Sequence, residues 1–444
     1  MSDTAEGLGM FQSVPGEYEA YQKASTSECP VSGMGAEFMP FSEEYLADPY
    51  AFFRRARAEE PVFFSAEMDA WVVMNYDDIV AIFQDPETYS AALARHPVTP
   101  LCPAAATLRD KLEITTEPSL VDEDPATHRD HRRIFGDAFT PKRLREIEPR
   151  IRAIVTRYID RFIDDGEADL VKQMLYEVPA LAIFIFLGAS DEDAVKVKIL
   201  GSKRALVNWG RPSDEEQVEM MAGMGEHWDF TKRLVDAALE NPGDNYMGDM
   251  VRIYRDDPSK FTINYLYNVA FLMQFAGHET TTQASANGIK ALLEDRGEWE
   301  AICANPDKMA NAVEEILRID SSIFAWRRIA TRDTEIAGHQ IMAGQKILLM
   351  LGSGSHDDAM FPGGAKFDHE RRNAKRNLAF GHGAHFCMGA PLARLEMKII
   401  LEELTRRLPH MQLSPDQDWE YIPTLTFRGV QMLLVEWDVE KNPG

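Results

Sequence analysis

Apolar residues recur every three to four positions along most of this chain, the spacing that places them on one face of an α-helix. Residues 1–40 lack this pattern and are rich in Ser, Gly and Glu, so we expect a loosely packed N-terminal arm. Because no internal repeat or low-complexity linker follows, residues 41–444 are expected to form a single domain. Helices are predicted over residues 45–59, 142–165, 168–187, 191–208, 214–240, 261–296, 308–319 and 390–407.

Alternation of apolar and polar residues, the pattern of a half-buried strand, is confined to short stretches. "PVFFSAEMDAWVVMNYDD" predicts two short strands around a turn at Glu67–Asp69, with Asp77 or Asp78 capping the helix that follows. Residues 328–350 carry glycine turns and predict a small sheet, and residues 420–438 predict a last hairpin. The predicted fold class is therefore mainly α with small β-sheets.

The segment 261–296 stands out because a proline-free stretch of this length would form a helix about 54 Å long. Such a helix crosses a whole domain. Its middle carries "FAGHETTT", Phe275–Thr282, where glycine and short polar residues are poor helix formers. Polar groups midway along a buried helix favour a functional site, and a surface-facing polar turn is the structural alternative.

The chain has 47 basic and 72 acidic residues and a net charge of −25. This charge argues against nucleic acid and anionic membranes as partners, since both bind basic surfaces. No apolar run reaches the ~18 residues of a membrane helix, and the N-terminus lacks the basic start and apolar core of a secretory signal. We therefore expect a cytoplasmic protein without a membrane anchor. Four cysteines without a CxxC pair predict no disulfide framework.

Cys387 lies in "NLAFGHGAHFCMGAPLARLE", a glycine- and histidine-rich loop that leads into a helical pattern. Gly381 and Gly383 permit tight turns that aim backbone N–H groups inward, and the positive end of the following helix favours a thiolate. Gly389 leaves room for a large flat group. A single thiolate without partners at zinc spacing fits a metal that brings its other ligands with it, as haem iron does.

Other kinds of site use some of the same residues. A Cys–His hydrolase would use Cys387 as nucleophile and His382 or His385 as base, but nothing marks an oxyanion hole. A zinc protease would need H-E-x-x-H, and Thr282 stands where the second histidine should be. A buried, inert cysteine is the structural alternative. The chain contains no Walker motif and no GxGxxG after a predicted strand, so we predict no nucleotide site.

The stretch "FGHGAHFCMG" closely resembles the cysteine-loop signature of the haem-thiolate monooxygenases, the cytochromes P450. "DEDPATHRDHRR", "AGHETT" and "EEILR" resemble three further motifs in the family's order. "CPVSG", "NWGRP", "AWRRIA", "LEELTRRLPHM" and "TFRGV" make the chain similar to haem domains of bacterial self-sufficient members, which carry a fused phthalate-dioxygenase-type reductase, and to their stand-alone relatives. The resemblance implies a cytochrome P450 fold with the helix 261–296 lying over haem b.

The resemblance also implies how the haem is held. Cys387 would be the proximal iron ligand, and His128, Arg132, Arg328 and His385 would bind the haem propionates. Two buried propionates carry two negative charges, for which arginine forks and histidine donors are natural partners.

Glu279 and Thr280 match the family's acid–alcohol pair, which delivers protons during oxygen activation. Many relatives carry Asp where this chain has Glu279, so the longer side chain is a departure from the pattern. Gly277 would let the helix open beside them. The implied structural charge cluster behind the haem is Glu315, Arg318 and Arg371. The expected substrate pocket is Leu272, Phe275, Ala276, Thr280, Phe324, Ala325 and Leu425.

The implied activity is the insertion of one oxygen atom of O₂ into C–H bonds of small apolar or aromatic substrates, by hydroxylation or O-/N-dealkylation. No flavin, pyridine-nucleotide or iron–sulfur motif lies in the 444 residues. Electrons from NAD(P)H are therefore expected through an FMN/2Fe-2S-type reductase, either fused after the end of this chain or separate. A haem gas sensor would need no proton relay and a peroxygenase often lacks the acid–alcohol pair, so the "ETT" turn argues against both alternatives.

Overall fold

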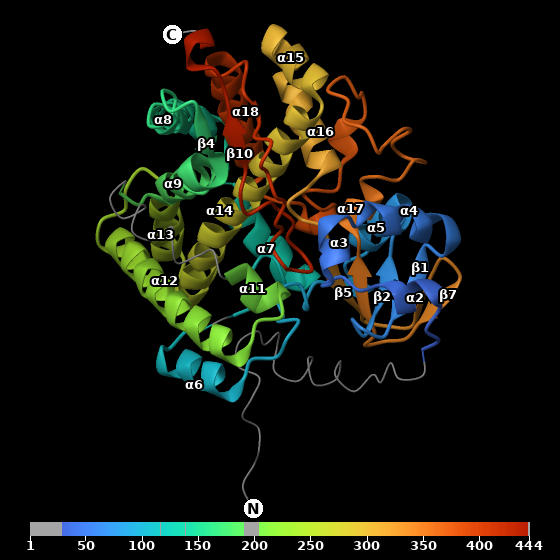
Figure 1. The fold of residues 1–444 in the computed structure, drawn as a ribbon. Coiled ribbons are helices and arrows are strands. Elements are labelled where there is room, and N and C mark those ends of the chain that lie inside the picture. The colour runs from blue at the N-terminus through green and yellow to red at the C-terminus, as the bar shows by residue number, and fades with distance from the viewer. Residues whose placement is uncertain (1–28, 116, 138, 191–203, 443–444) are drawn as a thin grey trace, which may run out of the picture.

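The computed structural model describes residues 29–115, 117–137, 139–190 and 204–442. Most of the predicted arm 1–40 and most of the predicted helix 191–208 lie outside these residues. Within them, helices form most of the molecule; β1, β2, β5 and β7 lie to the right in Figure 1, and β4 and β10 lie apart from them, near α8 and α18. The described ranges contain no helix that is both long and apolar enough to cross a membrane.

The helices and strands have the following bounds. The longer helices are α4 (Tyr50–Glu59), α5 (Tyr76–Gln84), α6 (Pro103–Lys111), α7 (Pro125–Gly136), α8 (Pro141–Ile159), α9 (Val178–Leu187), α12 (Asp214–Glu240), α13 (Tyr246–Asp256), α14 (Ile263–Glu294), α15 (Arg296–Ala304), α16 (Met309–Ile319) and α18 (Ala390–Arg407). The shorter ones are α2 (Gly33–Glu37), α3 (Glu43–Ala47), α11 (Arg204–Trp209), α17 (Leu351–Gly354), the π-helix η1 (Val171–Leu175) and the 3₁₀ turns η3 (Pro306–Lys308), η4 (Ala374–Arg376), η5 (Gly383–His385) and η6 (Val439–Lys441). The strands are β1 (Val62–Ser65), β2 (Ala70–Val73), β3 (Tyr89–Ser90), β4 (Glu167–Asp169), β5 (Trp326–Ala330), β6 (Thr334–Ile336), β7 (His339–Ile341), β8 (Lys346–Leu349), β9 (Gln412–Leu413) and β10 (Leu434–Glu436).

The helices with strong end signals begin and end where the sequence predicts. The predicted helix 214–240 is α12, whose N-cap Ser213 and Glu216 form a capping box. The predicted helix 390–407 is α18, which has a proline in its first turn. The predicted helices 261–296 and 308–319 are α14 and α16, with small differences at their ends.

Other predicted helices are wrong in their bounds. Residues 45–59 divide into α3 and α4, because Pro49 leaves Asp48 extended between them. Residues 168–187 form β4, η1 and α9 instead of one helix, since β4 pairs with β10 from the far end of the chain. The predicted helix 142–165 ends earlier, with α8 at Ile159.

One local prediction is also wrong, and another is confirmed only in part. Neither Asp77 nor Asp78 caps α5: the N-cap is Asn75, and both aspartates lie in the first helical turn, where the helix dipole favours negative charge. The hairpin predicted at residues 420–438 is confined to residues 420–431, where Ile422 N–H donates to the carbonyl of Gly429 at 3.0 Å and Gln431 N–H donates to that of Glu420 at 2.8 Å. Tyr421 and Val430 make an isolated bridge, and β10 pairs with β4 and β9 in a three-stranded sheet.

The largest sheet joins distant parts of the chain. Its five strands lie in the order β1-β2-β8-β5-β3, with β2 parallel to β8 and the other pairs antiparallel. Trp71 therefore lies opposite Ile347. The predicted small sheet of 328–350 contributes β5 and β8 to this sheet and the separate β6–β7 ribbon.

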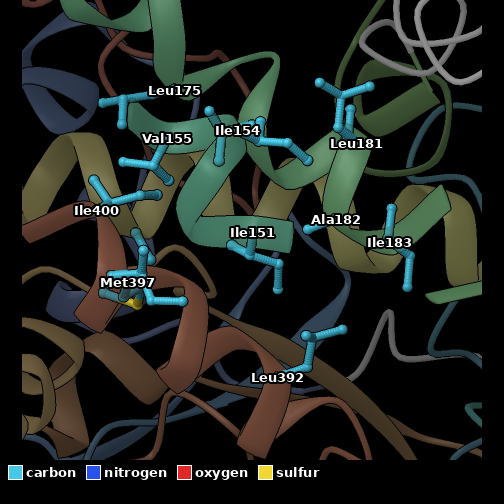
Figure 2. Close-up of a cluster of buried hydrophobic side chains, with 14 of the residues drawn as sticks. Ile151, Ile154, Val155, Leu175, Leu181, Ala182, Ile183, Leu392, Met397 and Ile400 are labelled. Carbon is cyan, nitrogen blue, oxygen red and sulfur yellow. The ribbon is translucent and has the colours of Figure 1, made fainter. Parts of the chain in front are cut away.

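Helix α14 crosses the molecule and packs against α9, α12, α16 and α18 (Figure 1). A large apolar cluster fixes α18 beside α8 and α9. Figure 2 shows Ile151 and Val155 of α8, Leu181 of α9, and Met397 and Ile400 of α18 in this cluster. The packing holds the beginning of α18, and the cysteine loop before it, at a fixed place beside α14.

Candidate active site

Cys387 is held by a tightly turned loop immediately before α18. Gly381 and Gly383 have φ angles of +67° and +70°, the left-handed region that glycine adopts without strain. The backbone N–H of Cys387 donates to the carbonyl of Phe380 at 3.0 Å, and this bond fixes the cysteine in the loop. The two turns and the adjoining helix therefore form as the sequence predicts.

The surroundings of the Cys387 sulfur only partly support a thiolate. Burial raises the pKa of the thiol above its ordinary value, while the backbone N–H groups of Gly389 and Ala390 and the charge of Arg132 act in the opposite direction. A Cβ atom at Gly389 would lie 3.8 Å from the sulfur, so the space beside it stays free. A cation bound in that space would supply the missing stabilisation of the thiolate.

Cys387 opens onto a deep, mostly apolar cavity. The middle of α14 forms another wall of it, because Ala276, Gly277 and Thr280 line the same cavity. These three have accessible surface although α14 is otherwise largely buried along this stretch. The structure thus brings the cysteine loop and the polar stretch of α14, which are more than a hundred residues apart, to one site.

Four basic residues line this cavity, Arg95, Arg132, Arg328 and His385, of which Arg95 is paired with Asp122. His128 lies behind them, with its ring stacked on that of His385 at a centroid distance of 3.9 Å. Burial lowers the pKa of Arg328 to about 9, that of His128 to about 4 and that of His385 to about 3. The two histidines are therefore neutral at pH 7, and the arginines carry the positive charge.

Arg132 and Arg328 lack acidic partners in the described part of the chain. Arg328 is only 2% exposed, and its Nη1 donates to the carbonyl of the preceding residue, Arg327, at 2.9 Å. Arg132 donates to the carbonyl of Phe386. His385 donates from Nδ1 to the carbonyl of Leu120 at 3.1 Å. Cations at a cavity wall without protein carboxylates suit a ligand that brings its own carboxylates, so these residues fit the two propionates of haem.

The polar stretch of α14 remains helical because its side chains find partners. Thr280 Oγ1 donates to the carbonyl of Ala276 at 2.6 Å and lies at the cavity. Glu279 is 2% exposed, accepts from Gln283 Nε2 at 2.9 Å, and is absent from the cavity wall. Burial raises its pKa to about 7. The acid and the alcohol are thus adjacent in sequence but face different surroundings.

Two more residues of this stretch anchor α14 to its neighbours. His278 contacts the carbonyl of Tyr176 at 2.7 Å through Nε2, and Thr282 donates to the carbonyl of Leu175 at 2.9 Å. A Cβ atom at Gly277 would lie 2.6 Å from Ile183 of α9. Close packing therefore explains this glycine, and α14 does not open there.

The predicted substrate pocket is only partly brought together. Leu272, Phe275, Ala276 and Thr280 line the cavity. Phe324, Ala325 and Leu425 do not, and this is a correction to the prediction: they lie in a separate apolar cluster around Phe53 and Met350. Phe324 and Ala325 lie just before β5, where the chain is not a regular strand, and the Phe324 ring packs on those of Tyr50 and Phe53.

Sequence reasoning missed an aromatic end of the cavity. It is formed by Trp209, Trp326 and Phe427 beside Phe275, with the Trp209 ring parallel to that of Phe275 at 5.9 Å and edge-on to Phe427 at 4.9 Å. The sequence could have indicated that Trp326 lines the cavity. It lies two residues before Arg328 in β5, so both side chains leave the same face of the strand.

Glu315, Arg318 and Arg371 form one buried ion cluster outside the cavity wall. Arg318 donates to both carboxylate oxygens of Glu315, at 2.8 and 2.7 Å, and Arg371 donates to one of them at 2.9 Å. Both arginines also donate to backbone carbonyls, including that of Lys366. The cluster ties α16 to the segment that leads toward the cysteine loop.

Comparison with known proteins identifies the fold and the family. A sequence model described as cytochrome P450 matches residues 308–428. The cytochrome P450 monooxygenase PikC of Streptomyces venezuelae is 31% identical over 95% of this chain and 98% of its own length.

Two solved structures share the whole fold. An intact type IV self-sufficient cytochrome P450 monooxygenase is 42% identical with a TM-score of 0.92; the match covers 94% of this chain and 55% of that one. The cytochrome P450 CREJ, solved in complex with (4-ethylphenyl) dihydrogen phosphate, is 36% identical with a TM-score of 0.87, over 91% and 100% of the two chains. This chain therefore belongs to the bacterial cytochromes P450, a family of haem-containing monooxygenases.

Proposed function

We propose that this monooxygenase inserts one oxygen atom of O₂ into C–H bonds of small, neutral, apolar or aromatic substrates. Where the attacked carbon carries an ether oxygen or an amine nitrogen, the product is a hemiacetal or carbinolamine, which breaks down as O- or N-dealkylation. The observation that carries the proposal is one cavity lined by Cys387, by Thr280 and by an aromatic end wall.

The charges around the cavity favour a neutral substrate. Among the described residues of the wall, the arginines are Arg95, Arg132 and Arg328. Arg95 is neutralised by Asp122 through two bonds of 2.9 and 2.7 Å, and the other two suit the cofactor's carboxylates. No arginine of this wall is then left for an anionic substrate. The phosphate ester bound by CREJ should therefore be a poorer ligand here than the corresponding neutral aryl ether.

Haem, when bound, supplies the iron at which O₂ is reduced and from which oxygen is transferred. Cys387 would hold it through a negatively charged sulfur, and Arg132, Arg328 and His385 would bind its carboxylates. Thr280 would present its hydroxyl, a carrier of protons, at the cavity. The adjacent Glu279, buried outside the cavity wall, is an acid whose pKa burial raises to about 7. The apolar wall would exclude bulk water.

The first experiment compares two reductants. The purified protein is treated with carbon monoxide and reduced with dithionite or with NADPH alone, and an aryl methyl ether is then turned over with a separate FMN/2Fe-2S reductase. We expect a red-shifted Soret band with dithionite, none with NADPH alone, and release of formaldehyde only with the reductase. A band with NADPH alone would contradict an external electron supply, and failure of all aryl ethers would contradict the substrate class.

The Thr280→Ala variant should consume NADPH with little product formation. Without the hydroxyl at the cavity, we expect product per NADPH to fall by roughly tenfold or more while peroxide rises, because a positioned proton donor has been lost. The measurement is product, peroxide and NADPH in the same reaction. Thr282→Ala is the matched control, since Thr282 bonds to the carbonyl of Leu175 outside the cavity. Equal coupling in both variants would exclude Thr280 from proton delivery.

The Arg328→Met variant should lose haem more readily. Methionine keeps most of the apolar volume but removes a buried charge-assisted bond worth about 1.5–3 kcal/mol, so haem affinity should fall by roughly ten- to a hundredfold. The measurement is the rate of haem transfer to an excess of apomyoglobin. Arg332→Met, an exposed arginine of the same segment, is the control. Unchanged transfer in Arg328→Met would show that Arg328 does not hold the cofactor.

A further inference from the structure

Trp326 has an indole N–H without an acceptor among the described residues of the protein. Every tryptophan that is buried in this part of the chain donates its indole N–H to a protein oxygen, at distances between 2.9 and 3.1 Å; these are Trp71, Trp209, Trp228, Trp299 and Trp437. Trp326 is only partly buried and lines the cavity. Its indole nitrogen is not one of the buried, unpartnered side-chain atoms of the described residues, so this N–H is accessible.

Trp326 lies where the aromatic end of the cavity meets its basic side. Its ring is 6.3 Å from that of Trp209, at an interplanar angle of 28°. Arg328 follows two residues later on the same face of β5, about 6.6 Å along the strand. A ligand whose ring packs at the aromatic end therefore has the Trp326 side chain as a neighbour.

Two other donors of the cavity wall are already used. The indole N–H of Trp209 donates to the carbonyl of Ala94 at 3.1 Å, and the Thr280 hydroxyl donates to the carbonyl of Ala276 at 2.6 Å. Trp209 can therefore offer a ligand only its ring. An indole N–H can donate a hydrogen bond but cannot accept one. The free N–H of Trp326 accordingly favours a ligand that carries an acceptor.

We propose that Trp326 is a specificity-determining residue, whose indole N–H donates to an oxygen of a neutral aromatic substrate. The ring of that substrate would pack at the aromatic end, against Trp209, Phe275 and Phe427. The preferred ligands are then aryl ethers and aryl ketones, above hydrocarbons of the same shape. This inference rests on the proposed function and narrows its substrate class.

The physical reason is the cost of leaving a donor unpaired. A hydrocarbon that fills the aromatic end displaces water from the Trp326 N–H and offers nothing in return. An ether or carbonyl oxygen at the same place replaces the lost bond. Because donor and acceptor are both neutral, the net gain is that of an ordinary hydrogen bond, and affinity should differ by about two- to tenfold.

The first test compares ligands of matched shape. Dissociation constants of anisole and ethylbenzene are measured by calorimetry on haem-loaded wild type, Trp326→Phe and Trp209→Phe. The two ligands differ in hydrophobicity, but this difference is the same for every variant, so the change in their affinity ratio isolates the bond. We expect Trp326→Phe to lower the preference for anisole by about two- to tenfold. Acetophenone against α-methylstyrene should show the larger change, since a ketone oxygen is the stronger acceptor.

Trp209→Phe is the matched control. It shortens another tryptophan of the same wall, but one whose N–H is given to the carbonyl of Ala94. Both ligands should bind this variant more weakly by a similar factor, so that their ratio stays that of the wild type. A ratio that changes by less than about twofold in Trp326→Phe, or by the same factor in Trp209→Phe, would overturn the proposal.

The second test observes the N–H itself. In protein with ¹⁵N-labelled tryptophan, the seven indole signals are recorded in the diamagnetic ferrous carbon monoxide form. The signal that is missing from Trp326→Phe should move downfield with anisole and stay in place with ethylbenzene, whose ring produces the same ring-current shift. Should Trp326→Phe not retain haem, the wild-type spectra still decide: if no indole signal distinguishes the two ligands, the proposal is wrong.

The haem carboxylates are the other oxygens that this face of β5 could reach. If they accept the N–H, Trp326→Phe should lose haem to apomyoglobin faster than Trp209→Phe, while the ligand ratio stays unchanged. That result would overturn the proposal and make Trp326 a cofactor-binding residue. Ser322, a hydroxyl of the same wall, gives a further comparison. A ratio lost in Ser322→Ala and kept in Trp326→Phe would also overturn the proposal.

The two proposals fail separately. If the wild type prefers anisole through Trp326 but oxidises no tested substrate, the proposed function fails and the binding role of Trp326 stands. If the wild type oxidises aryl ethers and Trp326→Phe keeps the wild-type ligand ratio, only the role of Trp326 fails.

Discussion

Cys387→Ala is expected to abolish the red-shifted carbon monoxide band and to reduce product formation to background. Alanine removes the sulfur that would carry the negative charge on the iron, and no other cysteine lines the cavity within the described residues. Arg132, Arg328 and His385 remain, so the variant should still take up some haem. The measurement is the dithionite-reduced carbon monoxide spectrum together with haem content and formaldehyde release.

Cys303→Ala is the matched control for this result. Cys303 is half-buried at the end of α15 and is not part of the cavity wall, and burial raises the pKa of its thiol to about 11. It should retain the thiolate-type band and full activity. A thiolate-type band in Cys387→Ala would show that another group binds the iron, and the assignment of the cysteine loop would be wrong.

Glu315→Gln should produce the largest loss of stability. Glu315 is completely buried and holds both Arg318 and Arg371, so the substitution leaves two buried guanidinium groups without a countercharge. Breaking a buried pair in this way costs about 3–5 kcal/mol. Since whole domains are stable by only about 5–15 kcal/mol, we expect a much lower urea midpoint and loss of haem at mild denaturant concentrations.

An exposed pair provides the control. Glu294→Gln removes the partner of Lys290. Like Glu315, Glu294 is a helical glutamate with a cation one turn away, but it is 45% exposed. Exposed pairs of this kind are worth about 0.3–0.5 kcal/mol. If Glu315→Gln and Glu294→Gln unfold at the same urea concentration, the buried cluster does not hold α16 to the segment before the cysteine loop.

The sequence predicted elements best where local signals agree with the final packing. Ser213 with its capping box and Pro391 in a first helical turn mark ends that depend on nearby residues alone. Residues 168–187 show the opposite case. Their apolar spacing is helical, but Glu167–Asp169 pairs with Leu434–Glu436, a partner that no local pattern reveals.

The site could be predicted only in part for a similar reason. The sequence motifs identified Cys387, Arg328 and Thr280 as site residues, and the structure brings all three to one cavity. Side-chain direction was not available from motifs, so Phe324 was expected where Trp326 lies.

The strand order of the five-stranded sheet has a consequence for synthesis on the ribosome. The β1–β2 hairpin cannot acquire its parallel neighbour until Lys346–Leu349 has left the exit tunnel, some 270 residues after Val73. At about 5–20 residues per second, that delay is roughly a quarter of a minute to one minute. An isolated hairpin is marginally stable in water, so the nascent chain exposes its apolar strands for this interval. Slow translation between residues 73 and 346 should therefore increase aggregation and chaperone demand during expression.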